Sequence, residues 1–159
     1  MTVNAEQRLV ELGIELPEPF APAGNYVPAV RSGRLVFVSG HGPTANGAVV
    51  YRGKVDSVVG VEDAYQAARL TALNCLASLR AELGSLDRVE RVVKVLGLVN
   101  ADPGFERHPE VINGASELFV DVFGERGGHA RSAVGMSSLP FGIPVEVELV
   151  VEVADVAGA

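Results

Sequence analysis

The sequence has few of the residues that several common classes of protein require. Its 159 residues include one cysteine, Cys75, so no disulfide can form within the chain and no site with several cysteine ligands can hold a metal. No apolar run approaches the roughly 18 residues of a membrane span. The first 13 residues are amphipathic and carry charges where a signal peptide would be apolar. We therefore expect a cytoplasmic protein that does not enter a membrane.

Positive charge is also scarce. There are 13 Lys and Arg residues against 20 Asp and Glu, which gives a net charge of −7. A protein that binds nucleic acid by neutralising phosphates needs a cationic surface, and so does one that docks on anionic lipid. This balance disfavours both partners. The hydrophobic fraction of 48% is high enough for one well-packed domain.

The patterns of several catalytic chemistries are missing. There is no G-x-S-x-G motif around a serine, no Walker loop, and no G-x-G-x-x-G after a strand. His41, His108 and His129 lack the spacing of a metal site, and only convergence in the fold could join them. Cys75 lies on the apolar stripe of a helix and is best interpreted as a packing residue. We expect no metal site and no nucleotide binding.

Hydrophobic periodicity and capping residues predict three helices. They are a short helix over Asn4–Leu12, a long one over Val61–Leu83 and a third from Pro109 to Gly124. A proline-rich stretch follows the first helix, so residues 1–24 are interpreted as a helix and tether ahead of a single domain, residues 25–159. The expected strands are residues 27–30, 35–39, 88–100, 131–136 and 145–153. This order predicts an α+β sheet with two helices on one face.

The expected strand over Arg88–Asn100 is apolar on both of its faces. Two helices can cover only one side of the sheet, which would leave a large apolar patch on the other side. A second subunit is expected to cover that patch, so the sequence predicts a homo-oligomer.

One strand combines a buried face with an acidic one. Glu146, Glu148 and Glu152 alternate with valines and leucine in the last strand. For Glu148 and Glu152 we favour a solvated surface, whereas Glu146 lies next to the Pro-Phe-Gly loop. Arg131 begins the preceding strand, which we expect to lie beside it, and an arginine can clamp a carboxylate with two parallel hydrogen bonds. A structural ion pair of Arg131 with Glu146 or with a neighbouring residue is the alternative.

Several short motifs together resemble one known family. The sequence resembles the Rid family of reactive intermediate/imine deaminases, also called YjgF-like or "endoribonuclease L-PSP", and in particular its longer bacterial branch. The resemblance covers most of the chain from about Asn25 to Val153. The motifs that carry it are Asn25-Tyr26-Val27-Pro28, Val38-Ser39-Gly40-His41-Gly42-Pro43, Val111-Ile112-Asn113-Gly114-Ala115-Ser116, Ala130-Arg131-Ser132-Ala133-Val134-Gly135, Leu139-Pro140 and Val145-Glu146-Val147-Glu148.

The resemblance implies a chorismate-mutase-like α+β fold of the bacillus type and a homotrimer with active sites between subunits. It implies hydrolysis of enamines and imines such as 2-aminoacrylate and 2-iminobutanoate to 2-oxo acids and ammonia, without a cofactor. Arg131 would clamp the substrate carboxylate, and Glu146 would position or activate the attacking water. The residues that would contact the substrate are Tyr26, Ser39, Gly40, His41, Asn113 and Ala133.

Two positions depart from the better-known deaminases. Ala133 stands where a cysteine is common, so only a backbone role remains there. His41 stands where a glutamine is common. It either adds a titratable group to the pocket or is a loop histidine with local hydrogen bonds. Three other functions stay open: a non-catalytic trimer that binds small carboxylates, a hydrolase of a carbamate or another acylated amine, and a ribonuclease. The negative charge disfavours the ribonuclease.

Overall fold

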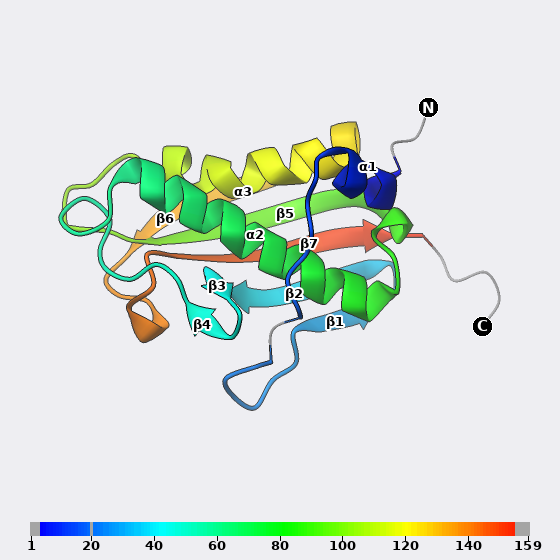
Figure 1. Ribbon diagram of the computed structural model, residues 1–159, viewed down its shortest axis with the longest axis horizontal. Coiled ribbons are helices and arrows are strands. Elements are labelled where there is room, and N and C mark those ends of the chain that lie inside the picture. Colours follow the sequence, from blue (N-terminus) through cyan, green and yellow to red (C-terminus); the bar gives the residue numbers. More distant parts are fainter. Residues whose placement is uncertain (1–3, 20, 155–159) are drawn as a thin grey trace.

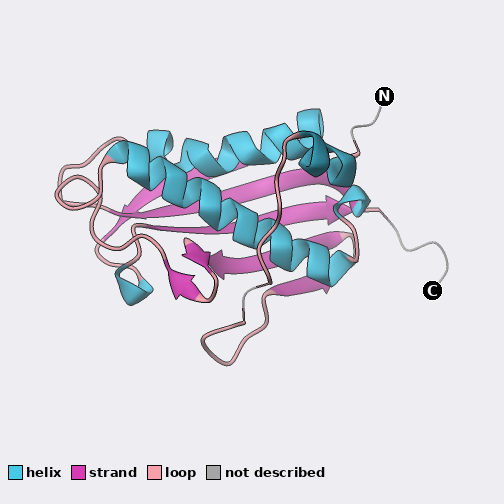
Figure 2. Ribbon diagram, in the orientation of Figure 1, coloured by secondary structure: helices cyan, strands magenta, loops and turns pink. Residues whose placement is uncertain are grey.

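A computed structural model describes residues 4–19 and 21–154 of the chain. Its main feature is a five-stranded sheet, with two long helices lying side by side across one face (Figures 1 and 2). The other face carries no helix of the described chain (Figure 1). This is the predicted α+β architecture.

The helices begin and end close to where the sequence predicts. Helix α1 (Ala5–Glu11) is capped by Asn4, whose side-chain oxygen accepts a hydrogen bond of 2.7 Å from the backbone nitrogen of Gln7. Helix α2 (Val61–Leu83) ends at Gly84, which takes the left-handed conformation that glycine adopts readily. Helix α3 (His108–Phe123) has proline in its first turn and ends at Gly124. Short 3-10 helices are η1 (Leu86–Arg88), η2 (Gly124–Gly127) and η3 (Pro140–Gly142).

The five strands of the sheet are arranged in the order β1-β2-β7-β5-β6. All neighbours are antiparallel except β5 and β6, which are parallel. A separate two-stranded hairpin, β3 with β4, was not predicted. The bounds are β1 (Ala29–Ser32), β2 (Leu35–His41), β3 (Thr44–Ala45), β4 (Ala48–Val49), β5 (Val89–Asn100), β6 (Ala130–Met136) and β7 (Val145–Val153).

The strand order corrects one expectation. Strands β6 and β7 follow each other in sequence and were expected to be neighbours, but β5 lies between them and pairs with both. The helix between β5 and β6 explains this, because a strand–helix–strand crossover returns the chain to the same end of the sheet and places β6 beside β5 and parallel to it. The strands that carry Arg131 and Glu146 are therefore not adjacent.

The core lies between the sheet and the two long helices. Helices α2 and α3 approach closely at Gly114, where a Cβ atom would overlap with the backbone oxygen of Tyr65. Gly97 of β5 likewise makes room for the side chain of Ile112. Small residues at these two places let α3 pack against both α2 and the sheet.

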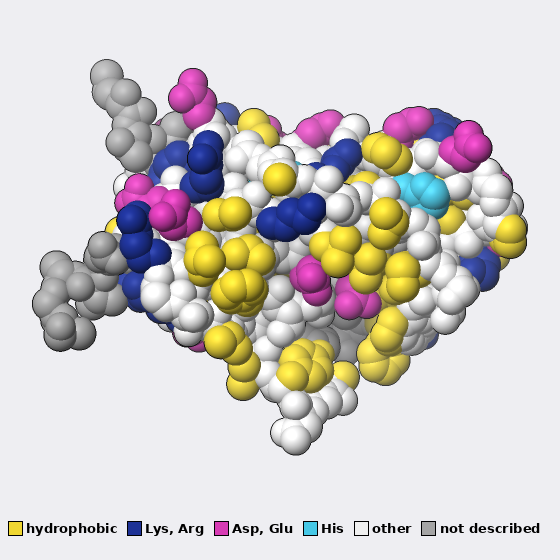
Figure 3. Space-filling model, turned by 180° about the vertical axis from the view of Figure 1, so that it is seen from behind, with side chains coloured by type: hydrophobic (Ala, Val, Ile, Leu, Met, Phe, Trp, Pro, Cys, Tyr) yellow, Lys and Arg dark blue, Asp and Glu magenta, His cyan; other side chains and the backbone are white. Residues whose placement is uncertain are grey.

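We call the sheet face turned away from α2 and α3 the open face. Hydrophobic side chains gather on it (Figure 3). Val30 is 52% exposed, Phe37 46% and Val134 43%. Register and alternation place the following apolar residues on the open face: Val30, Phe37, Leu96, Leu98, Val134 and Val150. Within the described chain, no helix combines the length and the apolar character that crossing a membrane requires.

Candidate functional site

A small cavity lies beside Glu146, at the start of β7. Its volume is about 100 Å³. Val145 and Val147 on either side of Glu146 are buried in the core, so strand alternation directs the Glu146 side chain to the open face. The residues that line the cavity are Ala23, Tyr26, Gly40, His41, Gly42, Thr44, Val49, Pro140, Phe141, Ile143 and Glu146. Four predicted site residues therefore meet here: Tyr26, Gly40, His41 and Glu146.

Gly40 leaves room for the carboxyl group of Glu146. A Cβ atom at position 40 would overlap with Oε1 of Glu146. Only a residue without a side chain lets the carboxyl group lie against the backbone of β2 at this point. This contact gives a physical reason for the glycine in the Ser39-Gly40-His41 motif.

The surroundings of Glu146 favour its protonated form. Burial raises the pKa of Glu146 above its ordinary value, and the charge of Glu148 two residues later raises it further. A carboxyl group in such a place exchanges protons closer to neutral pH than an exposed one, which suits acid–base chemistry.

The loop before β7 places an aromatic side chain at the cavity. Phe141 has φ 58°, a conformation that side chains other than glycine rarely adopt, and it is 62% exposed. Two contacts hold the loop: Arg52 donates to the carbonyl of Phe141 at 2.5 Å, and the backbone nitrogen of Gly53 donates to the carbonyl of Gly142 at 2.7 Å. Phe141 is not among the site residues predicted from the sequence. The Pro-Phe-Gly turn was the signal available.

Ser39 and His41 are held by internal hydrogen bonds. The Ser39 hydroxyl donates to the carbonyl of Val27 at 2.7 Å and so fixes the segment that carries Tyr26. His41 is 2% exposed, and its ring nitrogens lie 2.6 Å from the carbonyl oxygen of Ser39 and 2.8 Å from the hydroxyl of Ser78. Burial lowers the pKa of His41. The ring thus has the locally bonded arrangement that the sequence left as one alternative.

Arg131 lies in a second cluster, on the side of the sheet that α3 covers. Its Nη1 donates to Oδ1 of Asn113 at 2.9 Å and to Oγ of Ser116 at 3.0 Å. Its Nη2 makes a longer contact of 3.5 Å with the carbonyl of Pro109. Ala133, two residues along β6, shares this face and packs against the core. Asn113 and Arg131 were predicted site residues, whereas Ser116 was seen only as part of a motif.

The two clusters do not meet within one chain. Arg131 points toward α3, whereas Glu146 points to the open face, and β5 separates their strands. The expectation of a shared region, and with it the alternative of an ion pair between Arg131 and Glu146, is therefore wrong for a single chain. The physical reason is strand parity, because Arg131 aligns with Val95 of β5, whose side chain is buried under the helices, and Glu146 aligns with Leu98 on the open face.

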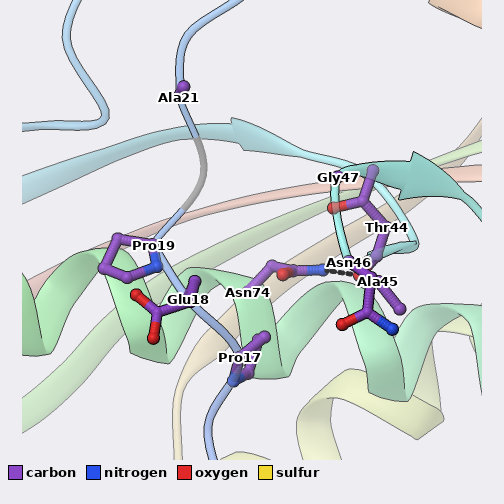
Figure 4. A pocket seen from close by; sticks show the side chains of 9 residues that line it. All are labelled: Pro17, Glu18, Pro19, Ala21, Thr44, Ala45, Asn46, Gly47 and Asn74. Atoms are coloured by element: carbon purple, nitrogen blue, oxygen red, sulfur yellow. Dashed lines mark hydrogen bonds between the residues drawn. The ribbon is translucent and has the colours of Figure 1, made fainter.

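Two other cavities contain none of the predicted site residues. One of about 440 Å³ lies between the tether, the β3–β4 turn and α2 (Figure 4), where the Asn74 amide donates to the carbonyl of Thr44 at 2.9 Å. One of about 450 Å³ lies beside Lys54, Phe105 and His108. Among the described residues, no three His, Cys, Asp or Glu side chains converge to hold a metal. Cys75 is fully buried, as expected of a packing residue.

Comparison with known proteins identifies the family. Residues 6–153 match the family model described as "YjgF/chorismate_mutase-like, putative endoribonuclease". The match covers nearly the whole chain, so the chain belongs to this family, of which the Rid proteins are part. Protein TCP17 of Trypanosoma cruzi is 46% identical over 145 residues, which are 91% of this chain and 91% of that protein.

Solved structures share the fold. Protein Atu1372 of Agrobacterium tumefaciens, described as of unknown function, is 46% identical, with a TM-score of 0.88 over 94% of this chain and 92% of that one. A Shewanella oneidensis protein described as a putative endoribonuclease is 34% identical, with a TM-score of 0.91 over 94% and 99% of the two chains. E. coli TdcF with bound serine has a TM-score of 0.58 at 23% identity over 87% and 94%, which shows the fold alone.

Proposed function

We propose that this protein hydrolyses reactive 2-imino acids and their enamine tautomers, such as 2-aminoacrylate and 2-iminobutanoate, to 2-oxo acids and ammonia. Arg131 of one subunit binds the substrate carboxylate, and Glu146 of a neighbouring subunit positions or activates the attacking water. The assembly is a homotrimer, and the reaction needs no cofactor.

The observation that carries the proposal is the way Arg131 is held. Asn113 and Ser116 occupy both hydrogens of Nη1. Among the described residues, none accepts a hydrogen bond from Nε, and Nη2 makes only the contact of 3.5 Å. Because Nη1 is occupied, the edge formed by Nε and Nη2 remains to give a carboxylate two parallel hydrogen bonds. The guanidinium is thus fixed on one side and free to bind on the other.

Besides the binding of the carboxylate by Arg131, the reaction needs only acid–base assistance. Water adds to the electrophilic imine carbon, the resulting carbinolamine loses ammonia, and a 2-oxo acid remains. In its ionised form, a carboxyl group with a raised pKa can move one proton from the water to the imine nitrogen as the carbinolamine forms. It can then move a second proton from the carbinolamine hydroxyl to the nitrogen as ammonia leaves. Binding the neighbouring carboxylate with Arg131 presents the imine carbon to the water in one orientation.

The separation of the two clusters supports a site built from two chains. Strand β6 is the edge of the sheet, and Glu146 lies on the open face. When the edge of one subunit packs on the open face of the next, the two clusters approach each other and the exposed apolar side chains are covered. Ala133 next to Arg131, and Tyr26 and Phe141 next to Glu146, then form the walls.

The test is complementation between two inactive variants. A dehydratase acting on serine supplies 2-aminoacrylate, and the release of 2-oxo acid is measured. We expect Arg131→Ala and Glu146→Gln each to reduce kcat/KM by about 100-fold or more. In trimers formed at random from equal amounts of both variants, about a quarter of the sites combine an intact Arg131 with an intact Glu146. Activity should therefore return to about a quarter of the wild-type value.

The outcome distinguishes the alternatives. No recovery in mixed trimers would contradict a site shared between chains. A wild-type protein that binds 2-oxo acids without accelerating hydrolysis would be a carboxylate-binding protein, in which Arg131 matters and Glu146 does not. The ribonuclease activity suggested by the descriptions of relatives needs a cationic surface, which a net charge of −7 disfavours.

A further inference from the structure

A chain of hydrogen bonds stands behind Arg131. Nδ1 of His129 lies 2.6 Å from the carbonyl oxygen of Gly127, and Nε2 lies 2.9 Å from Oγ of Ser116. The same oxygen accepts the hydrogen bond of 3.0 Å from Nη1 of Arg131. The chain of hydrogen bonds therefore runs from η2 through His129, which precedes β6, and Ser116 of α3 to the guanidinium.

The chemistry of the partners sets the direction of each bond. A carbonyl oxygen can only accept, so Nδ1 of His129 carries the hydrogen. In a neutral ring, Nε2 then has a free lone pair and accepts the hydroxyl hydrogen of Ser116. With its hydrogen used there, Ser116 presents only oxygen lone pairs to Arg131.

The surroundings of His129 favour this neutral ring. Burial lowers the pKa of His129, the hydrogen bond to Gly127 opposes that effect, and the charge of Arg131 lowers the pKa further. From α3 the ring faces Ser116 and the edge of Phe119, whose centroid is 6.0 Å away, and from η2 it faces the Gly127 carbonyl. Of the charged groups around it, Arg131 is the one that acts on its pKa.

We propose that His129 is a positioning residue for the anion site: its Nε2 orients the Ser116 hydroxyl, which holds Nη1 of Arg131 and so aims the Nε–Nη2 edge at the ligand carboxylate. This rests on the proposed role of Arg131. Without Ser116, only the bond to Asn113 and the longer contact with Pro109 would hold the guanidinium, and the Ser116 oxygen adds the second acceptor that fixes Nη1. From the sequence, His129 is only a possible metal ligand, and Ser116 only part of a motif.

Protonation of His129 reverses the chain. Nε2 then becomes a donor to Ser116, the serine hydrogen must find another acceptor, and the imidazolium repels the guanidinium. Affinity for a carboxylate should therefore fall as the pH drops through the lowered pKa of His129.

Two substitutions separate the ring nitrogens. Gln at position 129 can place its amide oxygen where Nε2 lies, so it keeps an acceptor for Ser116 and cannot titrate. Asn places its amide group near Nδ1, so it can donate to Gly127 but offers Ser116 no acceptor. The probe is pyruvate, measured by calorimetry, and the activity assay gives kcat and KM in parallel.

We expect His129→Asn and Ser116→Ala to weaken pyruvate binding about tenfold and to raise KM more than they lower kcat. His129→Gln should bind within about twofold of the wild type and lose the weakening at low pH. If His129→Gln is as weak as His129→Asn, or if His129→Asn and Ser116→Ala bind as the wild type does, the positioning role is wrong. Tighter binding at low pH would also overturn it.

Failure of the underlying function gives a different result, because Arg131→Ala would then bind pyruvate as tightly as the wild type. A measurement on the wild-type protein avoids any folding defect of the variants. Nitrogen-15 spectra of the imidazole at pH 7 should show the hydrogen of His129 on Nδ1. A hydrogen on Nε2 would refute the proposed direction of the chain.

Discussion

At the scale of single residues, the properties of the site come from close neighbours. Glu146 and Glu148 point to the same face of β7, where they align with Leu98 and Leu96 of β5. The apolar neighbours remove water from around Glu146, and Glu148 adds a like charge. Both effects raise the pKa of Glu146, which we propose positions or activates the attacking water.

The pH profile of activity tests this arrangement. The ionised form of Glu146 accepts the proton from water, so kcat/KM should rise with pH through the raised pKa of Glu146. Glu148→Gln removes the like charge, lowers the pKa of Glu146 toward its ordinary value of 4.5, and should move the acid limb of the profile to lower pH. Where Glu146 is ionised, its burial lowers the free energy of unfolding of the wild type. Glu148→Gln should make this loss smaller, because the like charge is gone.

Glu152→Gln is the matched control. Glu152 lies on the same strand and face but pairs with Arg34 at 3.4 Å, far along β7 from Glu146. Its replacement should leave the acid limb in place. An unchanged profile in Glu148→Gln, or an equal displacement in both variants, would show that Glu148 does not tune Glu146.

At the scale of elements, α3 connects the core to the site. Its inner face packs on β5 and α2, and its residues Asn113 and Ser116 hold Arg131. Gly114 lies between Asn113 and Ser116 in this helix. Because Gly114 has no side chain, the helix can come close to the backbone carbonyl of Tyr65 in α2. The position of the anion site therefore depends on how closely α2 and α3 pack.

Gly114→Ala should push the two helices apart. Alanine favours a helix more than glycine does, but the overlap with the backbone of α2 cannot be relieved by turning a side chain. We expect a net loss of about 1–3 kcal/mol in the free energy of unfolding. The KM for the imino acid should also rise, since Asn113 moves with the helix.

Thermal and urea unfolding measure the effect, with Val120→Ala as the control in the same helix. Val120 is 46% exposed, so its change should stay within about 0.5 kcal/mol. A Gly114→Ala protein that is more stable than the wild type would mean that the helix crossing tolerates a side chain and does not set the position of α3.

At the scale of the whole molecule, the open face is the main feature that one chain leaves unexplained. Apolar side chains from β1, β2, β5, β6 and β7 gather there (Figure 3). Glu146 lies on the same face, opposite Leu98 of β5. Monomeric proteins rarely expose an apolar surface of this kind. The predicted oligomer and the proposed two-chain site both follow from covering this surface.

Substitutions at two equally exposed residues test the assembly. Phe37 on the open face and Val120 on the helix side are both 46% exposed. We expect light scattering to give three chains for the wild type and for Val120→Glu, whereas Phe37→Glu should give monomers without activity, because burying an unpaired charge is costly. Trimers of Phe37→Glu, or a monomeric wild type, would contradict covering of the open face by further subunits.

Much of this fold could be predicted because its signals are local. The span of α2 follows from a hydrophobic period and from Gly84, and the cap of α1 follows from Asn4. The β3–β4 hairpin was not predicted because its strands have two residues each, and the Asn46-Gly47 turn was the only signal. Arg131 and Glu146 could be chosen as candidates from their residue types and from the family motifs.

Their mutual position could not be predicted in the same way. The amino-acid sequence by itself determined the elements, the buried faces and the motifs, since helix and strand periods, caps and glycines act over a few residues. Only the tertiary structure decided that β5 separates β6 from β7 and that Arg131 and Glu146 lie on opposite faces of the sheet. Strand order and parity depend on contacts between residues far apart in the chain, here the crossover through α3 that places β6 beside β5 and the pairing of β5 with β7.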